Sequence, residues 1–390
     1  MTSKDNHQKH VALQRPAKGE FGRNELAFLG TPCSEIQSLV MDLARSLSDD
    51  YSIAYVDQDH RKPSDEASEG SSDNKSIMTT MTDKIRFNRF DTRHVLSAVD
   101  KRRLLNQEDL ICVNGNHFFA QSQVIIIDPI KDLTKKLDRI NNVKLILYKD
   151  KLTTLPDPIK QHLPDWQTIP FFFLEETSKI TLWLRDWIVQ RLPPIKGLVL
   201  AGGESKRMKR DKGELVYHGK NQRAHTMELL ASHCEHTYLS CNAQQEESLK
   251  GGFPLIKDAF LDLGPMGGIL SAFRSDPNSA WLTVACDLPY LSHKTIKYLI
   301  SHRNASKLAT AFFDSKGEFP EPLVTLWEPR AYSVLLDYLS QGYSCPRKVL
   351  INSEVEMLRA PDKREFYNVN FPEQYEEVLK EIKAEPTEKE

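Results

Sequence analysis

The chain has 390 residues, and its 52 lysines and arginines nearly balance its 54 aspartates and glutamates. This balance excludes a general electrostatic attraction to nucleic acid, so a polyanion would have to bind at a local site. The length indicates about two domains. No apolar run approaches the roughly 18 residues that a membrane-spanning helix needs.

The cysteines and the N-terminal residues predict a cytoplasmic protein. The six cysteines form no Cys-x-x-Cys pair and no regular framework, which is typical of a reducing compartment. Residues 1–23 are mostly polar and lack the apolar core of a secretory signal. We expect them to form a disordered lead-in.

Residues 24–192 show alternating strand and helix patterns. Nearly continuous apolar runs predict strands buried on both faces, as in a parallel sheet, and apolar residues at helical spacing predict the helices between them. The predicted elements are strands at 25–29, 52–57, 109–113, 124–128 and 143–148, and helices at 36–47 and 177–190. Residues 62–80 are rich in polar side chains and are expected to form a flexible loop.

A second pattern of the same kind begins at residue 193. The segment Leu192-Pro193-Pro194 ends the preceding helix, because a residue before proline disfavours helical backbone. Further strands are predicted at 195–200, 237–241, 281–286 and 308–313, with helices between them. The predicted fold class is therefore α/β, with two three-layer domains at 24–192 and 193–382 and a charged, frayed tail at 383–390.

The segment Leu200–Lys212, LAGGESKRMKRDK, directly follows the first predicted strand of the second domain. Its adjacent glycines, Gly202 and Gly203, let backbone N–H groups approach phosphate oxygens. Five of the seven residues 206–212 are basic. This combination suits a triphosphate. A tight turn beside a solvated basic face is the alternative interpretation.

Asp287 directly follows the predicted strand 281–286. A carboxylate at the carboxyl end of a buried strand lies where open α/β sheets bind ligands. Mg²⁺ is commonly bound by one or two carboxylates together with phosphate oxygens. Asp287 is therefore a candidate magnesium ligand, and capping of the following turn is the alternative role.

Together these features resemble the molybdenum cofactor guanylyltransferase family, whose signature has the form LAGGxSxRMGxDK. The other matching positions are Asn242, Asp258, 264–268 (GPMGG), 286–289 (CDLP), 321–323 (EPL) and 368–370 (NVN). Their order and spacing agree with the family. The resemblance implies a Rossmann-like nucleotidyltransferase domain.

The resemblance also implies a reaction, in which GMP is transferred from GTP to molybdopterin with Mg²⁺ as cofactor and pyrophosphate as the second product. Such a transfer needs alignment and charge stabilisation more than a protein nucleophile. The residues implied to bind the nucleotide are Leu200, Ala201, Gly202, Gly203, Lys212, Asn242, Asp258 and Asp287. The residues implied to be catalytic are Arg207, Lys212 and Asp287, with Asp287 as the metal ligand.

Two segments depart from the family pattern. Lys209 stands where the family has glycine after Arg-Met, which costs energy if that position needs positive φ. The segment 219–223 (GKNQR) lacks the family's Pro-Leu after Gly-Lys. Gly202 favours guanine, because related cytidylyltransferases carry LAAG instead of LAGG. The alternatives are a CTP-dependent or sugar-phosphate nucleotidyltransferase of the same fold, or a non-catalytic adaptor that binds the cofactor.

The first domain looks like a P-loop domain that has lost its loop. When the motif G-x-x-x-x-G-K-[ST] is aligned from Gly30, its second glycine is replaced by Glu35, its lysine by Ile36 and its hydroxyl residue by Gln37. Because a carboxylate would repel the β-phosphate, NTP hydrolysis is not expected. Segments 56–60 and 110–118 resemble the GTP-binding adaptor protein of molybdopterin-guanine dinucleotide biosynthesis, with Asn114 where that family has an acidic residue. A generic α/β domain used for packing, docking or delivery is the alternative.

The expected partners are therefore GTP and molybdopterin, with molybdoenzymes or other cofactor-biosynthesis proteins as further candidates. Neither nucleic acid nor a membrane is expected as a partner.

Overall fold

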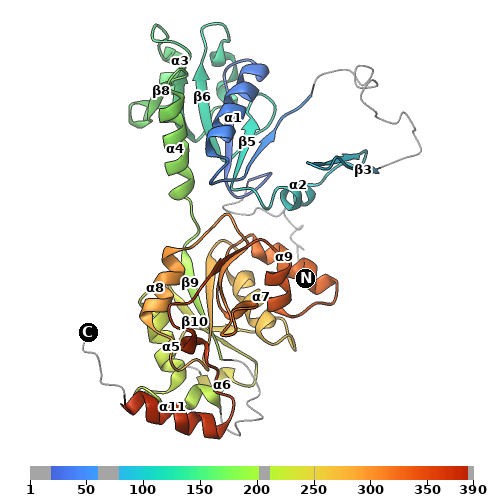
Figure 1. Ribbon diagram of the computed structural model, residues 1–390. Coiled ribbons are helices and arrows are strands. Elements are labelled where there is room, and N and C mark those ends of the chain that lie inside the picture. The colour runs from blue at the N-terminus through green and yellow to red at the C-terminus, as the bar shows by residue number, and fades with distance from the viewer. Residues whose placement is uncertain (1–18, 60–78, 202–210, 250, 385–390) are drawn as a thin grey trace, which may run out of the picture. The chain divides into compact units, whose positions relative to one another are not determined.

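A computed structural model describes residues 19–59, 79–201, 211–249 and 251–384. The chain divides into two compact units, Met1–Arg191 and Leu192–Glu390. Each unit is a sheet covered by helices (Figure 1). Within the described ranges, no helix combines the length and the apolar character needed to cross a bilayer.

The first unit is built on a six-stranded sheet in the order β2-β5-β1-β6-β7-β8. All five strand pairs in it are parallel. Its strands are β1 (Glu25–Leu29), β2 (Ile53–Val56), β5 (Leu110–Asn114), β6 (Ser122–Ile127), β7 (Val143–Tyr148) and β8 (Phe171–Phe173), and a separate hairpin pairs β3 (Thr79–Asp83) with β4 (Asn88–Thr92). Its helices are α1 (Cys33–Leu47), α2 (Ala98–Leu104), α3 (Asp157–His162) and α4 (Thr177–Val189), with 3-10 helices η2 (Leu133–Arg139) and η3 (Trp166–Thr168).

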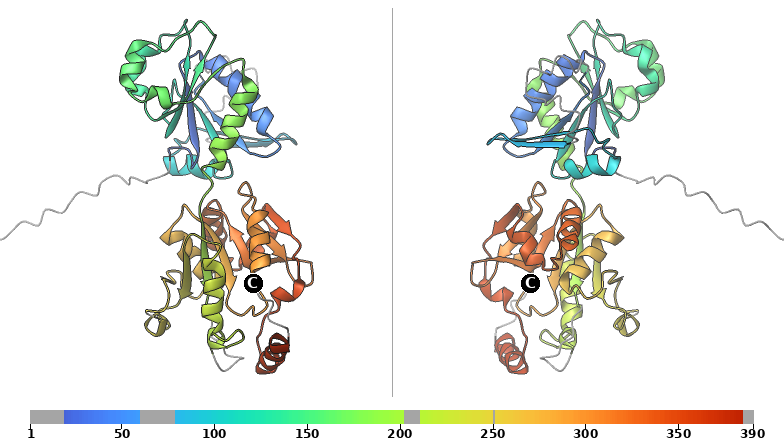
Figure 2. Two further views of the ribbon diagram at one scale, coloured as in Figure 1. Left: turned by 90° about the vertical axis from the view of Figure 1, so that its left-hand side faces the viewer. Right: turned by 90° about the vertical axis from the view of Figure 1, so that its right-hand side faces the viewer.

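Helices α1 and α4 pack side by side on one face of this sheet (Figures 1 and 2). The α1 residues Ile36, Val40 and Leu43 are buried at the helical spacing that its sequence shows. The opposite face is covered by η2 and α3, through Leu133 and Ile159. The unit therefore has three layers.

The second unit is built on a seven-stranded sheet in the order β11-β10-β9-β12-β14-β13-β15. Its strands are β9 (Ile195–Leu200), β10 (Thr237–Cys241), β11 (Leu255–Lys257), β12 (Ala280–Ala285), β13 (Ala309–Phe313), β14 (Pro320–Trp327) and β15 (Val355–Leu358). Its helices are α5 (Gln222–Ala231), α6 (Glu246–Leu249), α7 (Pro265–Ser275), α8 (His293–Ser301), α9 (Ala331–Ser340), α10 (Pro346–Ile351) and α11 (Pro372–Ala384), with 3-10 helices η4 (Lys212–Glu214) and η5 (Lys363–Phe366).

This second sheet is mixed. Strand β14 runs antiparallel to both β12 and β13, whereas β9, β10, β11 and β12 are parallel to one another. Two large apolar clusters cover its faces, one with helices α5 and α8 and the other with α7, α9 and α10. Both units are thus three-layer α/β structures, as the sequence predicted.

The structure differs from the sequence expectation at three segment ends. Phe21 is 3% exposed, and its ring meets that of Phe118 edge-on at 5.5 Å between centroids. Residues 19–23 therefore belong to the folded first unit rather than to a disordered lead-in. Thr79 and Thr80 lie in β3 rather than in the expected loop 62–80, and α11 continues to Ala384, into the expected tail.

Candidate active site

The candidate site lies along one edge of the second sheet, where neighbouring parallel strands end. Strands β11, β10, β9 and β12 stand next to one another in that order. Asp258, Asn242, Ala201 and Asp287 follow their last residues within one or two positions. Because parallel strands end at the same edge, the fold brings these sequence-predicted residues to one side of the sheet.

Lys212 and Asp287 form the centre of the site. Lys212 Nζ donates to Asp287 Oδ2 at 2.9 Å and to Asn370 Oδ1 at 2.7 Å. The side chains of Lys212 and Asp287 are 19% and 18% exposed. A half-buried ammonium group at the strand edge can neutralise phosphate charge.

The backbone around Lys212 is fixed by its neighbour Asp211. Asp211 Oδ1 accepts from the N–H of Gly213 and so caps η4. Asp211 Oδ2 forms an ion pair with Arg223 Nη2 at 2.5 Å, and Arg223 is only 6% exposed. Gly213 makes room for this arginine, since a Cβ there would lie 2.2 Å from Arg223 Nε. Arg223 thus holds the loop that presents Lys212.

Helix α5 brings Arg223 to this place. Asn221 caps α5 by accepting from the N–H of Ala224 at 2.8 Å, and Gln222 Nε2 donates to the carbonyl of Leu288 at 3.1 Å. The segment 219–223, which departs from the family's Pro-Leu, therefore forms a capped helix start tied to the strand end of Asp287. Polar side chains of this segment thus fix the start of α5 by hydrogen bonds.

The segment 368–370 closes the other side of the site. The N–H of Val369 donates to the carbonyl of Asp287 at 3.2 Å. Asn370 Oδ1 accepts the hydrogen bond from Lys212 Nζ. The backbone N–H of Asn370 donates to Gln374 Oε1 at 2.8 Å. Within the described residues, the buried Oδ1 of Asn368 has no hydrogen-bond partner. This segment positions Asp287 and Lys212 together.

Asp287 has the chemistry required of a metal ligand. Its Oδ2 receives Lys212, while its buried Oδ1 has no hydrogen-bond partner in the described part of the chain. A buried carboxylate oxygen without a donor is costly, and a divalent cation would satisfy it. Across the described residues, no group of three or more His, Cys, Asp or Glu side chains is arranged around a common metal position. The residues therefore fit a cation shared with substrate phosphates rather than an all-protein cage.

Asn242 and Asp258 are both engaged in local hydrogen bonds. Asn242 Oδ1 accepts from the N–H groups of Gln244 and Gln245, each at 2.9 Å. Gln245 Nε2 in turn donates to the carbonyl of Ala201 at 3.3 Å, which ties the ends of β10 and β9 together. Asp258 Oδ1 accepts from Ser240 Oγ at 2.8 Å. Burial raises the pKa of Asp258, and the Ser240 hydrogen bond opposes this rise.

Leu200 and Ala201 lie at the end of β9 and are 9% and 7% exposed, so only their backbone can serve a ligand at this edge. Gly202, Gly203, Arg207 and Lys209 lie outside the described residues. The roles expected for them remain predictions.

A cavity of about 790 Å³ adjoins the centre of the site. Asn368, next to Val369, is among its lining residues, and so is Tyr290, three residues after Asp287. Its basic and aromatic lining residues are Lys316, Arg347, Lys363, Arg364, Tyr290, Phe319, Phe366 and Tyr367. Its acidic lining residues are Asp314, Glu318, Glu321, Glu377 and Glu381. The lining therefore combines planar rings with charges of both signs, and it suits a flat aromatic ligand that carries polar groups.

Glu321 lies in this cavity and pairs with Arg347, whose Nη2 is 3.3 Å from Glu321 Oε2. Burial raises the pKa of Glu321, while the N–H of Leu323 and the charge of Arg347 lower it. The sequence singled out Glu321 as a family landmark but gave no hint of Arg347. Arg347, Arg223 and Asp211 are the site residues that sequence reasoning missed.

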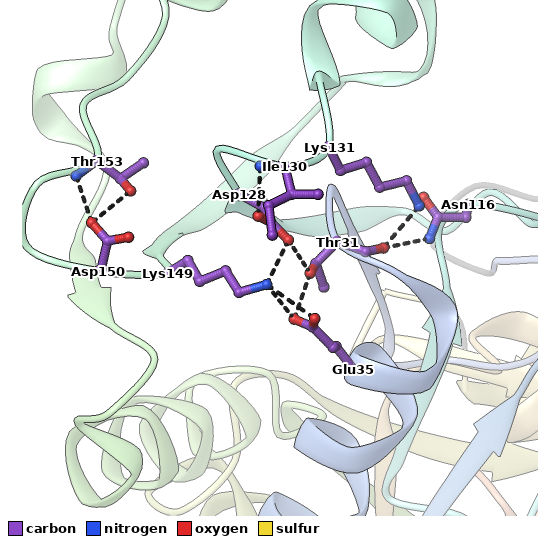
Figure 3. Close-up of polar contacts among 9 residues, drawn as sticks. All are labelled: Thr31, Glu35, Asn116, Asp128, Ile130, Lys131, Lys149, Asp150 and Thr153. Atoms are coloured by element: carbon purple, nitrogen blue, oxygen red, sulfur yellow. Dashed lines mark hydrogen bonds and ion pairs between the residues drawn. The ribbon is translucent and has the colours of Figure 1, made fainter.

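In the first unit, charged side chains meet beside the start of α1, where the sequence analysis predicted a lost P-loop (Figure 3). Lys149 Nζ bridges Asp128 Oδ2 at 2.9 Å and Glu35 Oε1 at 3.0 Å. Thr31 Oγ1 lies 2.9 Å from Glu35 Oε2 and 2.8 Å from Asp128 Oδ2, so its single proton is shared between the two carboxylates. The hydrogen bond of Lys149 to Asp128 raises the pKa of Lys149 most, and its hydrogen bond to Glu35 raises this pKa further. The negative charge of Glu35 is therefore balanced inside the protein rather than by a ligand.

The turn before α1 retains one requirement of such a loop. Gly30 has φ of 111°, and a Cβ there would lie 2.1 Å from the carbonyl oxygen of Ile126. Only glycine fits this position. Asn114, which stands where the resembling family is acidic, donates to Asp57 Oδ1 at 2.8 Å.

Comparison with known proteins defines the class of the second unit. Residues 197–356 match the family model of the MobA-like NTP transferase domain, so this unit is a nucleotidyltransferase domain. A molybdenum cofactor guanylyltransferase of Pseudomonas putida strain KT2440 is 30% identical over 190 residues, which cover 48% of this chain and 98% of that protein. The chain belongs to the molybdenum cofactor guanylyltransferase family.

Other relatives differ in how much of them the chain spans. The molybdenum cofactor biosynthesis bifunctional protein of a Synechocystis strain is 32% identical over 186 residues, which cover 47% of this chain but only 54% of that protein. The chain thus spans about half the length of this relative. A crystal structure of molybdopterin-guanine dinucleotide biosynthesis protein A from Archaeoglobus fulgidus matches 49% of this chain and all of that chain, with 21% identity and a TM-score of 0.43.

Proposed function

We propose that the second unit transfers GMP from GTP to the terminal phosphate of molybdopterin and releases pyrophosphate. The observation that carries this proposal is the Lys212–Asp287 pair at the parallel strand edge, in a chain that belongs to the guanylyltransferase family. The acceptor phosphate oxygen attacks the α-phosphorus, a new P–O bond forms, and the bond to pyrophosphate breaks. The protein supplies alignment and charge stabilisation for this transfer.

In this proposal each central residue has one task. Lys212 leaves Asn370 and Asp287 partly to meet the phosphate oxygens, and neutralises the charge that builds on departing pyrophosphate. Asp287, whose Oδ1 is buried without a donor among the described residues, would hold Mg²⁺. The magnesium ion would draw charge from the phosphate oxygens. Ala201, Asn242 and Asp258 line the adjoining strand ends, where the nucleoside is expected.

We place the acceptor in the cavity beside Asp287. Its arginines and lysines, which stand among carboxylates of the same lining, would meet the phosphate of molybdopterin, and Phe319 and Tyr367 would pack on the flat pterin ring. The cavity adjoins Val369, whose N–H is bonded to the carbonyl of Asp287. An acceptor bound there would meet the nucleotide at the strand edge.

The test is pyrophosphate release by the full chain from GTP, CTP or ATP with Mg²⁺, each with and without molybdenum-loaded molybdopterin. We expect release from GTP only, and only when the pterin is present. Release from CTP instead would overturn the choice of base. If folded protein binds the pterin but no nucleotide gives pyrophosphate, the chain is an adaptor and the proposed reaction is wrong.

A further inference from the structure

A group of reactive side chains lies in the first unit, on residues that the proposed transfer does not use. Cys33 Sγ is 3.2 Å from His117 Nε2. The same nitrogen is 3.9 Å from Asp57 Oδ1. The three residues come from the start of α1 and from the segments after β5 and β2, and are thus gathered at one edge of the sheet. The thiol and the carboxylate both face His117 Nε2, so this nitrogen can take the proton from sulfur, and the carboxylate lies near the positive charge that the ring would then carry.

The thiol of Cys33 lies at the N-terminus of α1. Cys33 is the first residue of this 15-residue helix. The preceding Pro32 gives the helix no side-chain cap, so the first-turn N–H groups keep their partial positive charge near the sulfur. A thiolate at a helix N-terminus beside a protonated imidazole is the arrangement found in reactive cysteines.

Two hydrogen-bond donors, the side chains of Asn116 and Lys131, lie near the start of α1. Asn116 Nδ2 lies 3.7 Å from Cys33 Sγ and also donates to the carbonyl of Thr31 at 3.0 Å. Lys131 Nζ reaches the same Thr31 carbonyl at 2.9 Å (Figure 3). Asn116 is 8% exposed, and its buried Oδ1 has no hydrogen-bond partner among the described residues. This orphaned oxygen is a second polar group at the site that a bound molecule could satisfy.

Electrostatic repulsion from Glu35, two residues after Cys33, is largely removed. Its carboxylate is bound by Lys149 and by the hydroxyl of Thr31. Electrostatic interaction links Cys33 with Lys131 and with Tyr55, and the carboxylate of Asp57 lies 3.9 Å from the same His117 nitrogen that Cys33 contacts.

The other cysteines offer a contrast. Burial raises the pKa of Cys112, Cys234 and Cys286 to about 12, and burial also raises that of Cys241. Cys345 is exposed. Cys33 is partly exposed and has the imidazole of His117 within hydrogen-bond distance. Cys345 is the matched control for Cys33, because its thiol is also accessible to solvent.

We propose that Cys33 is a reactive thiol site that exchanges with small anionic disulfides, such as oxidised glutathione. Cys33 Sγ passes its proton to His117 Nε2 and attacks one sulfur of the disulfide. A new S–S bond forms to Cys33, the original S–S bond breaks, and the departing thiolate takes the proton from His117. The Cys33 sulfur is oxidised and the disulfide is reduced, so no other oxidant is needed.

The test uses the fully reduced full-length chain at pH 7, with oxidised glutathione and, separately, 5,5′-dithiobis(2-nitrobenzoate) as probes. Labelled residues are identified by peptide mass spectrometry. Because an ordinary thiol is only about 3% ionised at pH 7, we expect Cys33 to react roughly tenfold or more faster than Cys345. Cys33→Ser should remove the fast reaction, and Cys345→Ser should leave it unchanged.

A second variant tests the role of the imidazole. His117→Gln should slow the labelling of Cys33 roughly tenfold and leave the labelling of Cys345 unchanged. Equal labelling rates at Cys33 and Cys345 in the unsubstituted chain would overturn the proposal. This comparison does not depend on whether any variant folds. An unchanged Cys33 rate in folded His117→Gln would also overturn it.

Discussion

Lys212 and Asp287 are 75 residues apart in the chain, yet Lys212 Nζ donates to Asp287 Oδ2 at 2.9 Å. The lysine begins η4, and the aspartate follows β12, the strand paired with β9. Their contact therefore depends on the pairing of two parallel strands. It places one cation and one carboxylate where the phosphates of a nucleotide are expected.

Replacing Lys212 tests this cation. Lys212→Met should lower the rate of pyrophosphate release from GTP on the order of 100-fold, since it removes a preorganised charge that stabilises the departing group. Steady-state pyrophosphate release is the measurement. Lys220→Met is the matched control, because Lys220 is exposed and, in the part of the chain that the structure describes, forms its ion pair with Glu228. Equal losses in both variants would contradict the role of Lys212.

Arg223 acts through Asp211 and is a positioning residue. Arg223→Met should lower kcat roughly 10- to 100-fold, because the Asp211 loop that presents Lys212 loses its ion pair. The KM for GTP should change little, and Arg223→Lys should restore part of kcat by keeping the charge. A purely structural role would instead reduce the amount of folded protein and leave the kcat of the folded fraction unchanged.

The proposed acceptor cavity makes a separate prediction about KM. Lys363→Met should raise the KM for molybdopterin several-fold, roughly the effect of one lost charged contact, and leave the KM for GTP unchanged. Lys363 lines the cavity, whereas Lys380 on α11 is exposed and outside it. Lys380→Met is the control. A rise in the KM for GTP alone would place the acceptor elsewhere.

The sequence predicted the buried strands well, because burial on both faces demands continuous apolar residues. The strand predicted at 143–148 is β7, and the one predicted at 195–200 is β9. Strand β14 was missed, since Pro320 and Pro322 at its start argue against a strand. Strands β8 and β11 have three residues each, too few to show a period.

The site was predictable where a residue ends a strand or lies in the basic, glycine-rich segment, as Lys212 does. Asp287 and Asn242 follow apolar runs, so their placement comes from the parallel order of the sheet. Arg223 lies inside a segment that looked like a mere departure from the family pattern. Its partner Asp211 is twelve residues away, and no local spacing indicates that Arg223 would be buried against it.

The ion pair of Lys149 with Asp128 should stabilise the first unit. The Asp128 side chain is fully buried. Burial raises its pKa, but hydrogen bonds from the Ile130 N–H, Lys149 and Thr31 outweigh burial, and its pKa is lowered overall. Lys149→Met leaves this carboxylate without its cation and should lower the free energy of unfolding of this unit by about 2 to 3 kcal/mol. Urea unfolding read by pulsed hydrogen exchange on β6 peptides is the measurement.

The control for this prediction is Lys160→Met, which removes an exposed pair with Asp157. Such surface pairs contribute about 0 to 1 kcal/mol, so β6 should unfold at nearly the same urea concentration. If Lys149→Met and Lys160→Met have equal effects, the Lys149 network does not stabilise the unit.

His225 makes the stability of the second unit depend on pH. Its ring stacks on that of His218 at 4.1 Å between centroids. Burial first, and then the positive charges of His218 and Lys220, lower the pKa of His225 to about 4. The unfolded chain, with an ordinary histidine pKa of about 6.5, binds this proton more readily. Stability is therefore fully present above about pH 6.5 and falls as the pH drops toward 4.

The expected loss is about 1 to 2 kcal/mol across this window, after allowance for the partial exposure of the ring. Urea unfolding at pH 7 and at pH 4.5, read by exchange in β12 peptides, measures it. His225→Gln cannot take up the proton, so the difference between the two pH values should shrink by that amount. His236 is 61% exposed, and His236→Gln should leave the difference unchanged. If the free energy of unfolding falls equally in His225→Gln and in the unsubstituted chain, the pH dependence belongs to other groups. His233 is one such group, because burial also lowers its pKa.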